Sequence, residues 1–450
     1  MDKQIKLDKD MLYSRKRGYG FITEPVRDLE KTLKIPELNS GFDILYWYMD
    51  SEVTRILEDE DGCYAVGVLD NGSVTSVNVP LFFKVDVECE GNYLITLKIK
   101  AGYQGVNSLT LFGGRRHLHL HSRKLESKEE LTYSFLVNVS DIIPRDDTEP
   151  HTDRSVDFAV LGEGVRISQV QIQSAETKTI FLAGDSTVTD QPSGYPYEPG
   201  ACYCGWGQAL PAYLSTGAAV SNHAHSGLTT ESFRKEGHYE ILTRLAKSGD
   251  IVLFQFGHND QKLSHLKAEE GYRDNLIRYI TECREKEILP VIVTPLSRNT
   301  WSEEGTKYVD LLKEYDKVCK QIGETYHVAV IDLHKRSKSF LLENGLEASK
   351  RYFYPGDYTH SNDFGGYLFA GFVAEEMKRI PKLAKYLVSK PTALVPEDSL
   401  VLPQKPENPV YETPPEHAAG YQIPFSGVYA KSPSDVTKEL EFLCGFSKAD

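Results

Sequence analysis

The spacing of apolar residues changes near residue 178, and this change limits the folds that the chain can adopt. From about residue 17 to 177, short alternating apolar and polar runs follow one another with turn residues between them. After residue 178, apolar runs alternate with stretches that carry apolar residues at helical spacing. Strands without intervening helices predict an antiparallel β-sandwich, whereas alternating strands and helices predict a parallel sheet covered by helices on both faces.

The upstream half is expected to contain a hairpin within residues 66–79, because Asp70-Asn71-Gly72 lies between two alternating runs and Asn-Gly suits a turn with positive φ. Further strands are predicted at residues 81–87, 93–99, 108–112, 132–139 and 165–172. Within this half, His117, His119 and His121 would share one side of a strand. A metal site is one interpretation, but no acidic or thiol partner is near in sequence, so we expect a polar face turned to water.

The downstream half is predicted to have strands at residues 179–183, 250–256, 288–295 and 328–333. Two amphipathic helices are expected between them, and a third at residues 364–377. Their apolar positions are Leu276, Tyr279, Ile280 and Cys283 in the first helix and Tyr308, Leu311, Leu312, Tyr315, Cys319 and Ile322 in the second. Since ligands of open α/β sheets bind at the carboxyl ends of the strands, residues just after these runs are candidate site residues.

A chain of 450 residues is too long for one typical core. We therefore expect a β-sandwich domain at 1–177, an α/β domain at 178–389 and a Pro-rich extension at 390–450. The extension is either a linker that ends in a helix near 434–446 or a strap over a folded surface, and the sequence leaves both open.

Composition disfavours several functions. The net charge of −14 argues against nucleic acid or an anionic membrane as a partner. No long apolar stretch and no secretory segment is evident, so we expect a soluble, cytoplasmic protein. Seven scattered cysteines suggest reduced thiols rather than a disulfide framework; Cys202 and Cys204 share a loop, where a redox role competes with simple packing.

The motif Gly184-Asp185-Ser186-Thr187 follows an apolar run and would place one serine hydroxyl in a loop. Alone, it reads more readily as an ordinary strand-ending turn. Acyl transfer from a serine also needs a base, a group that orients the base, and donors for the oxyanion. Ser226-Gly227, Gly257-His258-Asn259-Asp260 and Asp357-Tyr358-Thr359-His360 could supply these groups.

With these motifs, residues from about 178 to 388 resemble the GDSL or SGNH hydrolases, and within them the rhamnogalacturonan acetylesterase-like carbohydrate esterases. The resemblance implies a flavodoxin-like three-layer α/β/α fold. It also implies Ser186 as nucleophile, His360 as general base and Asp357 as the group that orients the imidazole. Further matching segments are Gly205-Trp206-Gly207-Gln208, Asn222-His223-Ala224-His225-Ser226-Gly227 and Val293-Thr294-Pro295.

The same resemblance implies an oxyanion hole formed by the N–H groups of Ser186 and Gly227 and the side-chain amide of Asn259, with no metal or organic cofactor. Asp185 and Asp260 would support the loops. Taken one at a time, Gly227 and Asn259 look like ordinary turn residues, and Asp357 and His360 look like part of an ordinary polar loop. Only the ordered set favours catalysis.

Substrate contacts are expected from Trp206, His258 and Tyr197. The loop 190–206 also holds Tyr195 and Tyr203, whose rings could stack on sugars, although Trp206 could equally pack in the core.

One departure from the family concerns the segment after Gly227, where Leu228-Thr229-Thr230-Glu231-Ser232 replaces an Arg-Ser-x-Arg-Ser-like segment. This change points to a neutral or differently decorated sugar.

The expected function is a serine acetylesterase that acts on plant cell-wall oligosaccharides of the pectin or rhamnogalacturonan type. A lipid or thioester hydrolase and a non-catalytic carbohydrate-binding protein remain alternatives. The upstream half weakly resembles the β-sandwich modules of carbohydrate-active enzymes, and the oligomeric state is left open.

Overall fold

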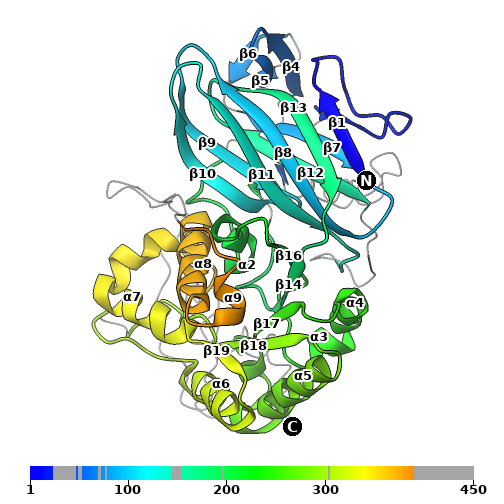
Figure 1. The fold of residues 1–450 in the computed structure, drawn as a ribbon. Coiled ribbons are helices and arrows are strands. Elements are labelled where there is room, and N and C mark those ends of the chain that lie inside the picture. Colours follow the sequence, from blue (N-terminus) through cyan, green and yellow to red (C-terminus); the bar gives the residue numbers. More distant parts are fainter. Residues whose placement is uncertain are drawn as a thin grey trace, which may run out of the picture.

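The computed structural model describes residues 1–23, 47–48, 53–68, 72–76, 79–143, 150, 154–191, 193–194, 197–302 and 305–389. The expected Pro-rich extension at 390–450, the turn residues Asp70 and Asn71, and Tyr195 lie outside this part. In Figure 1 an antiparallel half, coloured blue to green, stands above an α/β half, coloured green to orange.

The antiparallel half consists of two sheets that share one core. One has the order β11-β8-β13-β5-β4, with β1 on β13 and β6 on β5, and the other has the order β10-β9-β12-β7-β2. Inward residues of both sheets, such as Ile95 and Leu97 of β8 and Phe83 and Val85 of β7, form one buried cluster. The strands are β1 (Asp2–Lys6), β2 (Tyr19–Ile22), β4 (Val53–Asp59), β5 (Gly62–Val68), β6 (Val74–Ser76), β7 (Leu81–Asp86), β8 (Gly91–Ala101), β9 (Val106–Gly113), β10 (His117–Leu125), β11 (Glu130–Val139), β12 (Ser155–Leu161) and β13 (Val165–Ser174).

The five strands expected from the alternating pattern between residues 81 and 172 are confirmed as β7, β8, β9, β11 and β13. The hairpin is confirmed in its pairing, because β5 and β6 are antiparallel with Val68 opposite Val74. A short parallel pair, β3 (Trp47–Tyr48) with β15 (Ser193–Gly194), joins the two halves.

The α/β half is built on one parallel sheet with the order β16-β14-β17-β18-β19. Successive residues of β14 point into two different cores: Ile180 and Leu182 join the core beneath α8, whereas Phe181 and Ala183 join the core beneath α5 and α6. Helices therefore cover both faces of the sheet (Figure 1). The strands are β14 (Lys178–Gly184), β16 (Ala218–Asn222), β17 (Ile251–Gln255), β18 (Leu289–Val293) and β19 (Ala329–Ile331).

The longer helices of this half are α4 (His238–Leu245), α5 (Arg273–Glu285), α6 (Lys313–Tyr326), α7 (Leu333–Ser349) and α8 (Asp363–Met377). Short helical turns complete it: α2 (Trp206–Ala209), η3 (Leu210–Tyr213), α3 (Ser232–Lys235), η4 (Asp260–Lys262), η5 (Ser264–Leu266), η6 (Ala268–Tyr272), η7 (Lys350–Tyr352) and α9 (Pro381–Ala384).

Two of the predicted helices agree with the structure and one begins later than expected. The four apolar positions predicted for α5 are its buried residues, and α8 covers the predicted third helix. The helix α6 starts at Lys313 rather than near Tyr308. Tyr308 instead pairs with Trp301 in an isolated bridge, and its hydroxyl donates to the carbonyl oxygen of Arg298 at 3.0 Å.

The histidines of β10 correct an expectation. His117, His119 and His121 are all buried rather than facing water. The strand β10 packs against α2 and η3 of the other half, and its pairing with β9 shifts register between Leu118 and Leu120, so the three rings do not share one outer face. His117 Nε2 lies 3.0 Å from Asp190 Oδ1, and the ring of His119 packs on Phe135 with centroids 4.6 Å apart. Among the described residues, no group of three or more His, Cys, Asp or Glu side chains is arranged to hold a metal ion.

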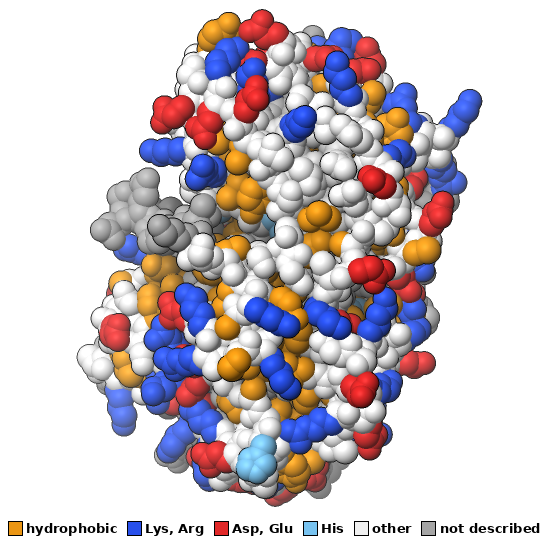
Figure 2. All heavy atoms as spheres, in the orientation of Figure 1, with side chains coloured by type: hydrophobic (Ala, Val, Ile, Leu, Met, Phe, Trp, Pro, Cys, Tyr) orange, Lys and Arg blue, Asp and Glu red, His pale blue; other side chains and the backbone are white. Residues whose placement is uncertain are grey.

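Three further observations concern the cysteines, the length of the helices and the charge of the surface. The six cysteines of the described chain are free thiols, and Cys202 and Cys204 are buried. None of the helices in the described ranges has the length and apolarity needed to cross a membrane. Figure 2 shows side chains of both charges over both halves of one face, so the net charge of −14 is not displayed there as a uniform acidic surface.

Candidate active site

Ser186 lies in the turn that follows β14, at the carboxyl end of the parallel sheet. Gly184 is required at the end of this strand, because a Cβ there would come within 2.6 Å of Val188 and 2.8 Å of the Gln255 carbonyl oxygen. The carboxylate of Asp185 then holds the turn by accepting hydrogen bonds from the N–H and the hydroxyl of Thr187, at 3.0 and 2.8 Å. The serine hydroxyl itself is left at a partly exposed position.

Three side chains form a continuous hydrogen-bonded line. Ser186 Oγ lies 2.8 Å from His360 Nε2, and His360 Nδ1 lies 2.8 Å from Asp357 Oδ2. Asp357 Oδ1 accepts two more hydrogen bonds, from the backbone N–H groups of Thr359 (2.7 Å) and His360 (3.0 Å). The structure thus brings together the three residues that the sequence predicted as a catalytic set.

The charge on Asp357 fixes the protonation pattern of this line. Burial by itself would raise the pKa of Asp357, but His360 and the two N–H groups outweigh it and lower the pKa to about 2. An ionised carboxylate can only accept, so the proton of the neutral imidazole must sit on Nδ1. His360 Nε2 is then free to accept the hydroxyl proton of Ser186, which is the arrangement of a general base.

Gly227 and Asn259 follow the two strands that flank β14 in the sheet, β16 and β17. The side-chain amide of Asn259 donates to the carbonyl oxygen of Leu228 at 3.1 Å, which joins Asn259 to the segment of Gly227. The neighbouring His258 reaches the serine turn, with Nδ1 3.2 Å from Asp185 Oδ2. Gly227 has φ of +86°, a conformation that side-chain-bearing residues rarely adopt, and it is exposed.

The orientation of the Asn259 amide is fixed by Lys262, whose ammonium donates to Asn259 Oδ1 at 2.9 Å. The amide nitrogen must therefore point the other way. One of its two N–H groups is used by Leu228, which leaves the second as a donor for another acceptor.

Of the three residues expected to contact substrate, two are buried in the interior and one is partly buried. Trp206 is fully buried and its indole N–H donates to Gln255 Oε1 at 2.8 Å, so it offers no face to a sugar. His258 is 2% exposed, with its second ring nitrogen 2.9 Å from the carbonyl oxygen of Leu296. The expectation is corrected for these two side chains, because both are committed to the protein interior. Tyr197 is partly buried and donates its hydroxyl to Asp363 Oδ2 at 2.5 Å.

A pair of tyrosines beside the imidazole was not predicted as a unit. Tyr203 and Tyr354 stack with ring centroids 3.8 Å apart, and the rings of Tyr203 and His360 are perpendicular, with centroids 5.9 Å apart. Tyr203 belonged to the aromatic loop singled out in the sequence. Tyr354 carried no signal, because only folding brings its segment against that loop.

The segment after Gly227 is occupied with structural contacts. Leu228 is buried in the core beneath α5, and Thr230 donates from its backbone N–H to Asp260 Oδ1 at 2.9 Å. Glu231 forms an ion pair with Lys235, and its Oε2 lies 3.1 Å from His265 Nε2. Burial raises the pKa of Asp260, to about 7, although Thr230 opposes the shift. Asp260 and Asp185 thus support the loops around the site, as expected.

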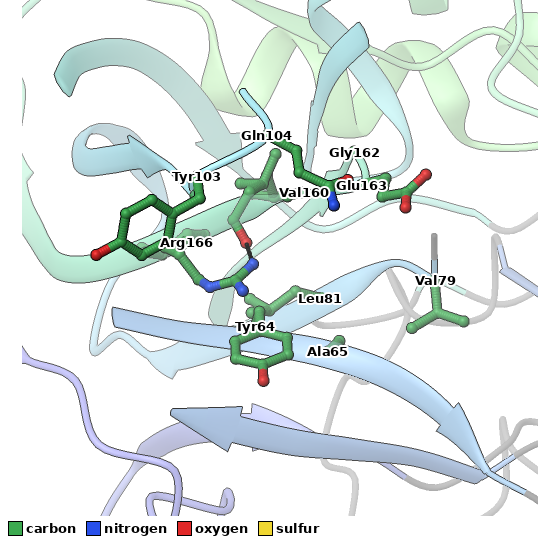
Figure 3. Close-up of a pocket in the computed structure, with 14 residues that line it drawn as sticks. Tyr64, Ala65, Val79, Leu81, Tyr103, Gln104, Val160, Gly162, Glu163 and Arg166 are labelled. Atoms are coloured by element: carbon green, nitrogen blue, oxygen red, sulfur yellow. Dashed lines mark hydrogen bonds between the residues drawn. The ribbon is translucent and has the colours of Figure 1, made fainter. Parts of the chain in front are cut away.

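A cavity of about 300 Å³ lies elsewhere, in the antiparallel half (Figure 3). Tyr64, Tyr103 and Arg166 line it together with apolar residues of both sheets, and the Arg166 guanidinium lies 3.7 Å from the centre of the Tyr64 ring. None of the predicted site residues is among those that line it.

Comparison with known proteins agrees with this geometry. Residues 182–366 match the model of the GDSL-like lipase/acylhydrolase family. A rhamnogalacturonan acetylesterase of Bacillus subtilis strain 168 is 36% identical over 225 residues, which cover 47% of this chain and 94% of the relative. A probable rhamnogalacturonan acetylesterase of the same strain is 31% identical over 209 residues, covering 45% of this chain and 93% of the relative.

A solved structure of another Bacillus subtilis protein is 19% identical with a TM-score of 0.41, and the match covers 84% of this chain and 98% of that protein. The family assignment does not depend on it, since the curated relatives match almost from end to end. The chain belongs to the GDSL-like lipase/acylhydrolase family and is a carboxylic ester hydrolase.

Proposed function

We propose that this protein is a serine carbohydrate O-acetylesterase that removes acetyl groups from pectic oligosaccharides of the rhamnogalacturonan type. The observation that carries the proposal is the line from Ser186 Oγ through His360 to Asp357, with both hydrogen bonds at 2.8 Å. The names of the curated relatives support the substrate class.

In the proposed reaction, Ser186 Oγ attacks the acetyl carbonyl carbon while His360 Nε2 takes the hydroxyl proton. Asp357 holds the imidazole in the required tautomer and stabilises the imidazolium that forms. His360 then returns the proton to the sugar oxygen as the ester bond breaks, which leaves an acetyl group on Ser186. Water, activated by the same imidazole, releases acetate and restores the serine.

The developing oxyanion would be bound by the N–H groups of Ser186 and Gly227 and by the free N–H of the Asn259 amide. The contact with Lys262 supports this role, because it prevents the amide from turning its oxygen towards the substrate. Donors preorganised in this way stabilise the transition state more than the ground state.

The substrate side of the site is proposed to include the stacked pair Tyr203 and Tyr354, which lies beside His360. Both rings are partly exposed. Aromatic faces next to an ester-cleaving site suit the apolar face of a sugar ring. The segment after Gly227 offers no arginine, so we propose a neutral or differently decorated sugar next to the acetyl group.

We also propose the three-part division at 1–177, 178–389 and 390–450. The first boundary is supported by the end of β13 at Ser174 and the start of β14 at Lys178. A cytoplasmic location is proposed on the free thiols of the described chain, which suit a reducing compartment.

The experiment is acetate release from acetylated rhamnogalacturonan and xylan oligosaccharides, with long-chain aryl esters included, by the wild type and by Ser186→Ala. Serine-dependent release that is fastest on the pectic oligosaccharides supports the proposal. Activity that rises with acyl chain length would replace it with a lipid hydrolase, and binding of oligosaccharides without any turnover would replace it with a carbohydrate-binding protein.

A further inference from the structure

Two neighbouring arginines of the antiparallel half are buried inside the α/β half. Arg115 and Arg116 form part of the turn between β9 and β10, and they are 5% and 1% exposed. Arginine is almost never buried to this degree unless it is paired. Each guanidinium has a buried carboxylate partner from the other half: Arg115 Nε donates to Asp190 at 2.8 Å and Arg116 Nη1 donates to Asp363 at 2.6 Å.

Arg116 ties together two segments that are far apart in sequence. Besides Asp363, at the start of α8, its guanidinium donates to the carbonyl oxygens of Gln191 (2.9 Å) and Tyr203 (2.7 Å). Burial would lower the pKa of Arg116, but Asp363 outweighs it and raises the pKa, so the side chain stays charged. One planar group thus fixes both the aromatic loop and the beginning of α8, which its several diverging N–H groups suit.

These two segments hold His360 between them. Two hydrogen bonds join the loop to the segment that carries His360. The Cys204 N–H donates to the Ser361 carbonyl oxygen at 2.9 Å, and Ser361 Oγ donates to the Cys204 carbonyl oxygen at 2.6 Å. The ring of Tyr203 packs against His360, and the backbone carbonyl oxygen of Tyr203 accepts a hydrogen bond from Arg116. Three residues beyond His360 is Asp363, the carboxylate partner of Arg116.

We propose that Arg116 is a positioning residue for His360, supplied to the active site by the antiparallel half. It acts through Tyr203 and Asp363 and touches neither Ser186 nor the imidazole. Arg115 does a related task next to it, because its second nitrogen donates to the carbonyl oxygen of Asn222 at 2.8 Å, at the end of the strand that leads to Gly227. The antiparallel half is thereby a structural part of the catalytic site, and this inference rests on the proposed function.

The test compares kcat and KM for an aryl acetate in the wild type, Arg116→Lys, Arg116→Ala and Arg244→Ala. Lysine keeps a charge for Asp363 but cannot donate to Tyr203 and Gln191 at once. We expect kcat to fall about 10²-fold in Arg116→Ala and about 10-fold in Arg116→Lys, with KM little changed, because small displacements of a catalytic group cost rate.

Arg244 is the matched control. It is also an arginine that joins the two halves, but in the described part of the chain it pairs with Glu90 and Asp141 at 2.8 Å rather than with the loop 190–206 or α8. Arg244→Ala should keep the wild-type kcat even if it melts earlier. All assays are run well below the melting temperature of each variant, and Asp363→Asn, which keeps the side-chain shape, replaces Arg116→Ala if that variant does not fold.

The outcomes separate the two proposals. Wild-type hydrolysis that does not depend on Ser186 would refute the proposed function and the positioning role with it. Ser186-dependent hydrolysis with wild-type kcat in folded Arg116→Lys and Asp363→Asn would refute only the positioning role, as would an equal loss of kcat in Arg244→Ala.

Discussion

Replacement of Asp357 by asparagine tests how the carboxylate controls His360. Asp357 Oδ1 accepts hydrogen bonds from two backbone N–H groups, at 2.7 and 3.0 Å, and Oδ2 accepts from His360 Nδ1 at 2.8 Å. In Asp357→Asn, the amide oxygen is needed at the Oδ1 position, because an NH₂ group there would face two other donors. The NH₂ group must therefore face His360 Nδ1.

This exchange reverses the tautomer of the imidazole. Nδ1 becomes an acceptor, the proton moves to Nε2, and Nε2 can no longer accept the hydroxyl proton of Ser186. A reversed tautomer in an otherwise intact triad of this kind lowers kcat about 10⁴-fold. At about 1.4 kcal/mol for each factor of ten, the barrier rises by about 5.5 kcal/mol.

The assay is kcat for an aryl acetate at neutral pH, with circular dichroism and a thermal melt to verify folding. Asp310→Asn is the control, because Asp310 Oδ2 also lies next to a buried histidine, 3.2 Å from His334 Nε2, and this pair is separate from the line that joins Ser186, His360 and Asp357. It should keep nearly full activity. A folded Asp357→Asn enzyme that retains more than about a tenth of the wild-type kcat would refute the tautomer argument.

Two other predictions concern the oxyanion and the response to acid. Asn259→Ala should lower kcat about 10²- to 10³-fold in the same assay, through loss of one donor, and an unchanged kcat would remove Asn259 from the hole. Burial lowers the pKa of His121 to about 4, below its ordinary value of 6.5, so the unfolded chain takes up this proton first as the pH falls. The stability that neutral His121 contributes is present above about pH 6.5 and is lost towards pH 4, on the order of 2 kcal/mol between about pH 7 and about pH 4.5. Urea unfolding at these two pH values should show a smaller drop for His121→Gln than for the wild type, and equal drops would contradict the assignment.

Much of the fold follows from local patterns, because the strands and helices bury one periodic set of residues. The buried residues of α5 are the four that the helical spacing marked. Prediction failed where contacts between distant segments decide the outcome. The alternation in β10 resembles a strand with one face in water, yet His117, His119 and His121 are buried, because β10 packs against the other half of the molecule and is irregular between Leu118 and Leu120, where His119 packs on Phe135. No local signal distinguishes these two situations.

The same limit applies to the site. Ser186, Gly227 and Asn259 were predictable, since each follows a strand of one parallel sheet and their motifs are short and ordered. The support that Arg116 gives was not, because its carboxylate partner lies 247 residues away in the chain. Trp206 was left open between sugar contact and core packing for a related reason: the sequence does not say whether an aromatic residue in a glycine-rich loop is exposed, and here it begins α2 and packs beneath the sheet.

The most direct test of the proposed mechanism is to trap the acyl-enzyme. The enzyme is mixed with an aryl acetate, quenched in acid within the first turnover, digested, and analysed by mass spectrometry beside Ser186→Ala. The mechanism predicts one acetyl group on the peptide that contains Ser186, absent from the variant and lost on longer incubation. Turnover without any acetylated Ser186, or an acetyl group on another residue that forms and decays at the rate of turnover, would contradict it.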